Sequence, residues 1–72
     1  MNKYYWLYKG KTYMVKDNIT IYDGNKCELK GILKQIIEND TCYKIIIELD
    51  KEFRYRAFNT GIFILTIDKK VN

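Results

Sequence analysis

Apolar and polar side chains alternate along several short segments of the chain. Within residues 27–37, the apolar positions of one parity are Cys27, Leu29, Leu33 and Ile37. The charged positions of the other parity are Glu28, Lys30 and Lys34. A period of two places successive side chains on opposite faces of a β-strand. The pattern therefore predicts antiparallel strands with one buried and one solvated face.

Glycine and Asn/Asp-rich turns separate these segments. The strands predicted from β-branched and aromatic content span 3–8, 12–15, 19–22, 27–37, 42–49, 53–58 and 62–67. Gly31 lies inside the longest of them and predicts a bulge or sharp bend. At 72 residues the chain has room for one domain and one core. We expect residues 1–72 to form an all-β domain, a small antiparallel barrel of five to six strands.

Two segments are apolar on both faces and break the alternation. They are Ile45–Ile47 and Ile62–Leu65. A chain this short has few elements with which to cover both sides of a strand, so an exposed face there favours contact with another protein. The predicted interface residues are Ile46, Ile62, Phe63, Ile64 and Leu65. We expect at least a homodimer through this surface.

The order of strands and turns in residues 19–67 resembles a known group of folds. The runs that carry the likeness are Ile19-Thr-Ile-Tyr-Asp-Gly, Lys30-Gly-Ile-Leu, Ile45-Ile-Ile-Glu-Leu-Asp, Phe53-Arg-Tyr-Arg and Ile62-Phe-Ile-Leu. This meander resembles SH3-like small barrels, including the Sm-like kind. The resemblance implies binding rather than catalysis, and it transfers no specific functional residue to this chain.

The net charge of the chain is concentrated at its N-terminal end. The net charge is +4, and residues 1–16 contain four lysines, no acidic residue and five of the eleven aromatic residues. A basic and aromatic surface suits an anion or a stacked base. Arg54 and Arg56, if on one strand, would lie about 6.6 Å apart, near the spacing of successive phosphates. The predicted nucleic-acid or anion contacts are Trp6, Lys9, Lys11, Arg54, Tyr55 and Arg56.

The same aromatic residues also have a purely structural interpretation. Tyr4, Trp6 and Tyr8 share one parity, so they could fill the core and leave the lysines as a solvated face. Both interpretations remain open at the level of the sequence.

Catalytic and metal-binding residue sets are missing from the sequence. There is no histidine, and Cys27 and Cys42 are the only cysteines, which we expect to be free thiols with Cys27 facing the core. The four glycines are scattered, so there is no phosphate-binding loop. We therefore predict no enzyme activity, no cofactor and no metal site.

Composition adds an expectation about origin and location. No segment approaches the length of a membrane span and no leader pattern is present, so we expect a cytoplasmic protein without membrane contact. The abundant isoleucine, lysine, tyrosine and asparagine have AT-rich codons, which indicates a low-GC bacterium or one of its phages.

Two functions follow from these patterns. The first is a compact protein-interaction adaptor or inhibitor, phage-encoded and of the antidefence or host-takeover type. The alternative is a small barrel that binds single-stranded nucleic acid through its basic and aromatic surface.

Overall fold

The computed structural model describes residues 2–24, 27–57 and 60–69 of the chain. Its elements are β1 (Asn2–Lys3), β2 (Tyr5–Tyr8), β3 (Lys11–Met14), β4 (Asn18–Asp23), β5 (Cys27–Glu38), β6 (Cys42–Leu49), the 3-10 helix η1 (Lys51–Ala57) and β7 (Ile62–Asp68). The protein is an all-β domain whose strand pairs are all antiparallel, as the alternation predicts.

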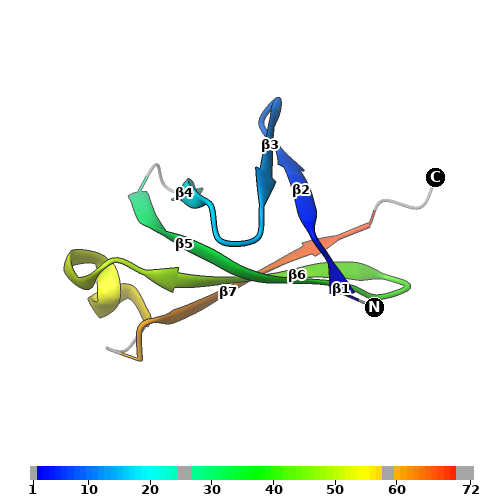
Figure 1. The fold of residues 1–72 in the computed structure, drawn as a ribbon. Coiled ribbons are helices and arrows are strands. Elements are labelled where there is room, and N and C mark those ends of the chain that lie inside the picture. The colour runs from blue at the N-terminus through cyan, green and yellow to red at the C-terminus, as the bar shows by residue number, and fades with distance from the viewer. Residues whose placement is uncertain (1, 25–26, 58–59, 70–72) are drawn as a thin grey trace.

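Five strands form one sheet with the order β1-β5-β6-β7, and β4 also pairs with β5. β4 pairs with the first half of β5, and β1 pairs near its end at Ile36 and Ile37. β6 pairs with the same two parts of β5 along one of its edges. β1 and β4 therefore both lie along the other edge of β5. Within the described residues no strand joins β7 to β4 or β1, so the sheet is open (Figure 1).

β2 and β3 form a separate two-stranded hairpin that stands over the sheet (Figure 1). Its turn consists of Lys9 and Gly10, which both have positive φ angles, 49° and 79°. Two such residues between paired strands match the twist of a tight hairpin. The segment that follows β3 joins the hairpin to the sheet. There the Lys16 amide donates to the Leu33 carbonyl, and the Leu33 amide donates to the Asp17 carbonyl.

The core lies between the inner face of the sheet and the hairpin. Its buried residues are Trp6, Ile19, Ile21, Leu29, Leu33, Ile36, Ile45, Ile47 and Leu49. Trp6 is the only one that the hairpin supplies. The parity predicted for residues 42–49 is confirmed, because Ile45, Ile47 and Leu49 all face this core.

The irregularity predicted at Gly31 lies further along the same strand. The register of β5 against β6 shifts between Leu33 and Gln35, which reverses the parity beyond that point. Ile36 is therefore buried instead of the predicted Ile37. Gly31 has another role. A β-carbon there would clash with the Glu48 carbonyl oxygen, so the absence of a side chain lets β5 and β6 approach closely.

The strand predicted at 53–58 is absent from residues 53–57, and residue 58 lies outside the described residues. Residues 51–57 form η1 instead, which begins when the Phe53 amide donates to the Asp50 carbonyl at 2.9 Å. Six residues of alternating pattern are too few to distinguish a strand from a helical turn, and Phe53 reaches the core from η1 equally well. The 3–8 strand is also interrupted, since a bend at Tyr4 separates β1 from β2.

Candidate interaction site

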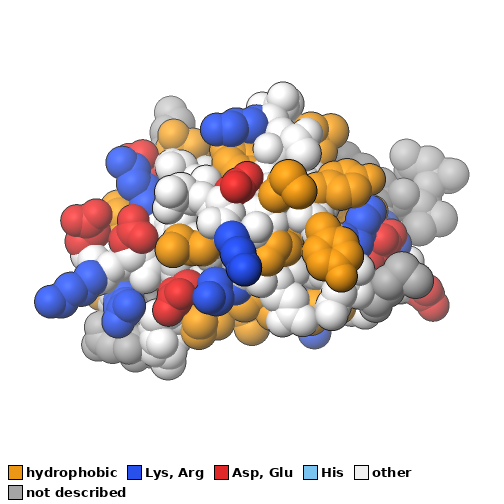
Figure 2. Space-filling view, viewed as in Figure 1, with side chains coloured by type: hydrophobic (Ala, Val, Ile, Leu, Met, Phe, Trp, Pro, Cys, Tyr) orange, Lys and Arg blue, Asp and Glu red, His pale blue; other side chains and the backbone are white. Residues whose placement is uncertain are grey.

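The outer face of the hairpin is apolar and exposed. Tyr5 and Met14 are cross-strand partners, each 56% exposed, and Leu7 beside them is 64% exposed. Tyr4, at the bend before β2, is 76% exposed. Figure 2 shows hydrophobic side chains gathered over the region of β1 and β2, whereas charged side chains of both signs occupy the opposite end. We call Tyr5, Leu7 and Met14 the hairpin face.

A hollow of about 210 Å³ adjoins the hairpin face. It is lined by Lys3, Tyr5, Trp6, Leu7, Ile36 and Tyr43, which come from β1, β2, β5 and β6. The Lys3 ammonium lies 5.3 Å from the ring centre of Tyr5 and 5.8 Å from that of Tyr43. At these distances a cation is attracted by the electron-rich ring faces. The hollow is therefore mainly aromatic and aliphatic, with one ammonium group at its wall.

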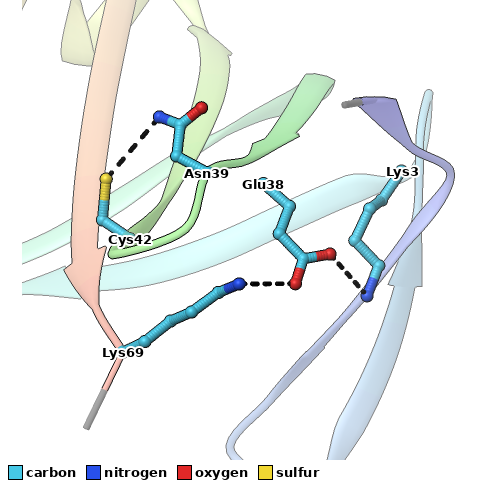
Figure 3. A network of polar contacts seen from close by, with 5 residues as sticks. All are labelled: Lys3, Glu38, Asn39, Cys42 and Lys69. Carbon is cyan, nitrogen blue, oxygen red and sulfur yellow. Dashed lines mark hydrogen bonds and ion pairs between the residues drawn. The ribbon is translucent and has the colours of Figure 1, made fainter. Parts of the chain in front are cut away.

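Glu38 holds that ammonium group in place (Figure 3). Its carboxylate lies 3.4 Å from the Lys3 Nζ and accepts a hydrogen bond of 2.7 Å from the Lys69 Nζ. The bond from Lys69 and the charge of Lys3 hold the pKa of Glu38 below its usual range. The same bond raises the pKa of Lys69. Glu38 thus links β1, beside the hairpin, to the residue that follows β7.

The hairpin tip carries lysines that lie over tyrosine rings. Lys9 Nζ is 4.9 Å from the ring centre of Tyr22, and Lys11 Nζ is 5.1 Å from that of Tyr13. Both lysines are exposed, and neither forms an ion pair with a described residue. This arrangement leaves positive charge at the surface, but the ammonium groups cover part of the ring surface on which a base would stack.

The residues predicted to contact nucleic acid do not form one surface. Trp6 is buried and stacks on Tyr8, with ring centres 4.7 Å apart. Arg54 lies on η1, at one end of the sheet and away from the hairpin tip (Figure 1). Its Nε donates to the Leu49 carbonyl at 3.4 Å. Tyr55 is exposed on η1, and the side chain of Arg56 lies outside the described part of the structure.

The predicted geometry of the two arginines is wrong, because their segment is a 3-10 helix. With three residues per turn, positions two apart in sequence point in different directions. Residues 54 and 56 therefore do not occupy alternate positions of one strand, on which the predicted spacing of about 6.6 Å depends.

The predicted protein interface divides between two faces of the sheet. Ile46, Ile62 and Ile64 face outward, with Ile62 43% and Ile64 55% exposed. Phe63 and Leu65 point the other way and pack against the core. We call Ile46, Ile62 and Ile64 the isoleucine strip. Alternation along β7 separates its four predicted residues into an exposed pair and a packed pair, and Ile46 on β6 lies beside the exposed pair.

The sequence analysis missed the hairpin face, although its signal was available. Tyr5 and Leu7 alternate with Trp6 and Tyr8, so residues 5–8 are apolar on both faces, as are 45–47 and 62–65. The Cys27 side chain lies outside the described residues, and Cys42 is a free, half-buried thiol that accepts a hydrogen bond from Asn39.

Neither a metal centre nor a membrane span adds to these surfaces. Among the described residues, no three Cys, Asp or Glu side chains are grouped so that they could hold a metal ion. The part of the chain that the structure describes has no helix long and apolar enough to cross a membrane. A scan against models of protein families, a search of curated proteins and a search of solved structures found no match to this chain.

Proposed function

We propose that the protein is a non-catalytic interaction module, a compact adaptor or inhibitor that binds a partner protein through the hairpin face. The observation that carries this proposal is a group of three exposed apolar side chains on the hairpin, two of which line an adjoining hollow. Isolated apolar side chains on a surface are ordinary, whereas a contiguous patch on a small domain marks a contact surface.

The residue types of the hairpin face suit protein binding. Tyrosine, tryptophan and methionine are enriched in interface cores, because they bury much area with few rotatable bonds or adapt their shape to the partner. The hollow has room for an apolar side chain of the partner between Tyr5, Leu7 and Tyr43. Binding hot spots consist of such anchors in pockets.

Charge around the hairpin face favours an acidic partner. The exposed lysines Lys9, Lys11 and Lys16 lie on or just after the hairpin, and residues 1–16 contain no acidic side chain. Complementary charge at an interface rim accelerates association and excludes wrong partners. The partner surface should therefore carry an apolar side chain for the hollow, surrounded by Asp or Glu.

Two finer statements belong to the same proposal. The fold is an open relative of SH3-like barrels, supported by the β4–β7 meander and the irregular β5 strand. A phage-encoded inhibitor of the antidefence or host-takeover type is supported by small size and by the AT-rich codon preference of the composition.

Affinity capture from a lysate of the native host tests the proposal. Tagged wild-type protein should retain a partner protein after nuclease treatment, and Leu7→Ser should lose it, since it removes the side chain between the hollow and the exposed face. Ile64→Ser is the matched control, because Ile64 is similarly exposed on another surface. Equal retention by the wild type and Leu7→Ser would contradict the proposal.

Single-stranded nucleic acid is the second candidate ligand, supported by Lys9 beside the exposed ring of Tyr22 and Lys11 beside the half-buried ring of Tyr13. Binding of this kind should weaken steeply with salt, with a slope of about 0.7 per phosphate contact. Lys9→Ala with Lys11→Ala should then lower both the affinity for a labelled oligonucleotide and that slope. Absence of binding at low salt would eliminate this candidate and leave the protein partner.

A further inference from the structure

The outer edge of β7 presents backbone groups that no neighbouring strand of the described structure pairs with. The Leu49 amide donates to the Gly61 carbonyl and the Lys69 amide donates to the Thr41 carbonyl, so the odd-numbered residues of β7 face β6. In an antiparallel ladder the alternate residues direct their N–H and C=O groups the other way. The even-numbered residues are Ile62, Ile64, Thr66 and Asp68. Among the described residues no strand pairs with this edge.

β7 lacks the features that usually protect such an edge. Native sheets shield their edges with charged side chains, proline, bulges or covering loops. From Ile62 to Ile67 there is no charged residue and no proline, and the ladder with β6 has no register shift. β4 at the opposite edge begins with the polar Asn18, whereas β7 begins with Ile62, and both strands end with an aspartate. The edge most open to a new strand is therefore β7.

We propose that the strand that pairs with this edge is β7 of a second copy. The two strands run antiparallel across a two-fold axis, with Ile64 opposite Ile64 of the second copy. Ile62 of each copy then lies opposite Thr66 of the other. The two sheets become one continuous sheet, and the hairpin face is not part of the contact, so this inference does not depend on the proposed function.

Apolar continuity selects this register. Ile46 and Ile64 are cross-strand partners. Pairing at Ile64 therefore brings the two isoleucine strips together, with Ile46 and Ile64 of each copy in one row of four isoleucines. Shifting the second copy so that Ile64 meets Thr66 would separate the strips. Shifting the other way, so that Ile64 meets Ile62, would keep apolar contact but shorten the paired segment.

Charge complementarity selects the same register. Lys44 and Glu48 flank Ile46 on β6, opposite Thr66 and Ile62 respectively. With Ile64 opposite Ile64, one row of side chains runs from Lys44 and Thr66 of one copy to Ile62 and Glu48 of the other. This row has a positive charge at one end and a negative charge at the other. Pairing Ile64 with Thr66 would instead place Asp68 in the row of Glu48, with only Ile62 between the two carboxylates.

Two local hydrogen bonds at Ile62 must be exchanged on pairing. The Ile62 amide donates to the Thr60 hydroxyl at 3.2 Å, and the Thr60 hydroxyl also donates to the Ile62 carbonyl at 3.4 Å. Bonds to Thr66 of the second copy would replace these contacts with backbone bonds of similar strength. Ile64 and Thr66 are even-numbered residues in the middle of the strand, so the ladder can form there first.

Light scattering on the full chain at high micromolar concentration tests the proposal. The expected mass is twice 8.7 kDa. Ile64→Lys places two like charges on the axis and should reduce the mass to that of one chain. Tyr22→Lys, on the rival edge strand β4, should leave the dimer intact. A single-chain mass for the wild type, or a dimer that survives Ile64→Lys, would overturn the proposal.

A cysteine pair tests the register and does not depend on the lysine variant. In a Cys27→Ser, Cys42→Ser background, Ile64→Cys places two thiols across the axis, where α-carbons about 5.5 Å apart permit a disulfide. Thr66→Cys is the control, since its two copies would lie about 13 Å apart. Mild oxidation should link the first variant and leave the second unlinked. A link in Thr66→Cys, or none in Ile64→Cys, would rule out this register.

Discussion

The hairpin face and the isoleucine strip are both exposed and apolar, but they differ in how the chain supports them. The strip lies on β6 and β7 within a five-stranded sheet, where each residue is fixed by a cross-strand neighbour. The hairpin has only its own two strands, and within the described structure its one buried residue is Trp6. The strip is thus a rigid surface, and the hairpin face is a surface on a lightly attached ribbon.

Because their support differs, the isoleucine strip and the hairpin face suit different kinds of contact. An open strand edge recognises another strand through regularly spaced backbone groups, which demands a rigid ladder. Aromatic and methionine side chains on a ribbon recognise shape and can adjust to it. A mutation can therefore impair one region and leave the other intact.

The largest effect is expected where the hairpin meets the core. Trp6→Ala should cost about 3–5 kcal/mol of unfolding free energy, because it empties a large buried volume. A domain of this size has about 4–10 kcal/mol in total. Urea unfolding followed by far-UV circular dichroism measures the loss, with the exposed Tyr4→Ala as the control. A loss under about 1 kcal/mol would mean that the hairpin is not held by Trp6.

A smaller effect is expected inside the sheet that supports the strip. Gly31→Ala should cost about 1–3 kcal/mol, since its β-carbon would meet the Glu48 carbonyl and the Ile47 side chain. The same unfolding measurement checks this value. Lys34→Ala is the control, because its ion pair with Glu48 is half exposed and should contribute little. A stability like that of the wild type would show that β5 and β6 separate easily.

Changes on the two exposed surfaces should barely alter stability. Leu7→Ser and Ile64→Ser should each shift the unfolding free energy by no more than about 0.5 kcal/mol, since both side chains are already exposed. Their binding effects should differ completely. We expect the first to lose the partner protein in capture and the second to lose the dimer in light scattering. Loss of both activities by either variant would show that the two surfaces are one.

The smallest effect concerns Glu38, which joins the two regions. Its pKa is lowered in the fold, so its contribution to stability is present above the unfolded pKa and disappears as the pH falls through the folded pKa. The raised pKa of Lys69 adds stability that is lost only at alkaline pH. Melting temperatures between about pH 3 and about pH 7 should fall less on acidification for Glu38→Gln than for the wild type. Parallel curves would contradict this assignment.

Strand alternation predicted most of the sheet correctly. The segments 42–49 and 62–67 match β6 and β7 almost residue for residue, because their turns and parity agree. The fate of residues 53–58 was not predictable from parity, since the local bond to Asp50 and the path of the chain to β7 determine η1. The register shift near Lys34 was also hidden, because a bulge changes parity without leaving a distinctive residue type.

The candidate sites were predicted less well than the strands. Parity shows that residues 5–8 have two apolar faces, but only the placement of the hairpin shows which face is buried. The grouping of Arg54 with Lys9 and Lys11 assumed that separate basic segments meet, and such meetings depend on tertiary structure. Ile46 and Ile64, in contrast, were assigned to one surface from strands that proved to be neighbours.

The position of Trp6 also gives this protein an internal optical reporter. It is the only tryptophan in the chain, and it lies where the hairpin rests on the sheet. Regions with few buried contacts open before the whole domain unfolds. Opening of the hairpin would move the indole from an apolar to an aqueous environment and shift its emission to longer wavelength. The intrinsic fluorescence of the unmodified chain therefore reports opening of the hairpin, which is distinguished from unfolding of the sheet when the emission shifts before the far-UV circular dichroism changes.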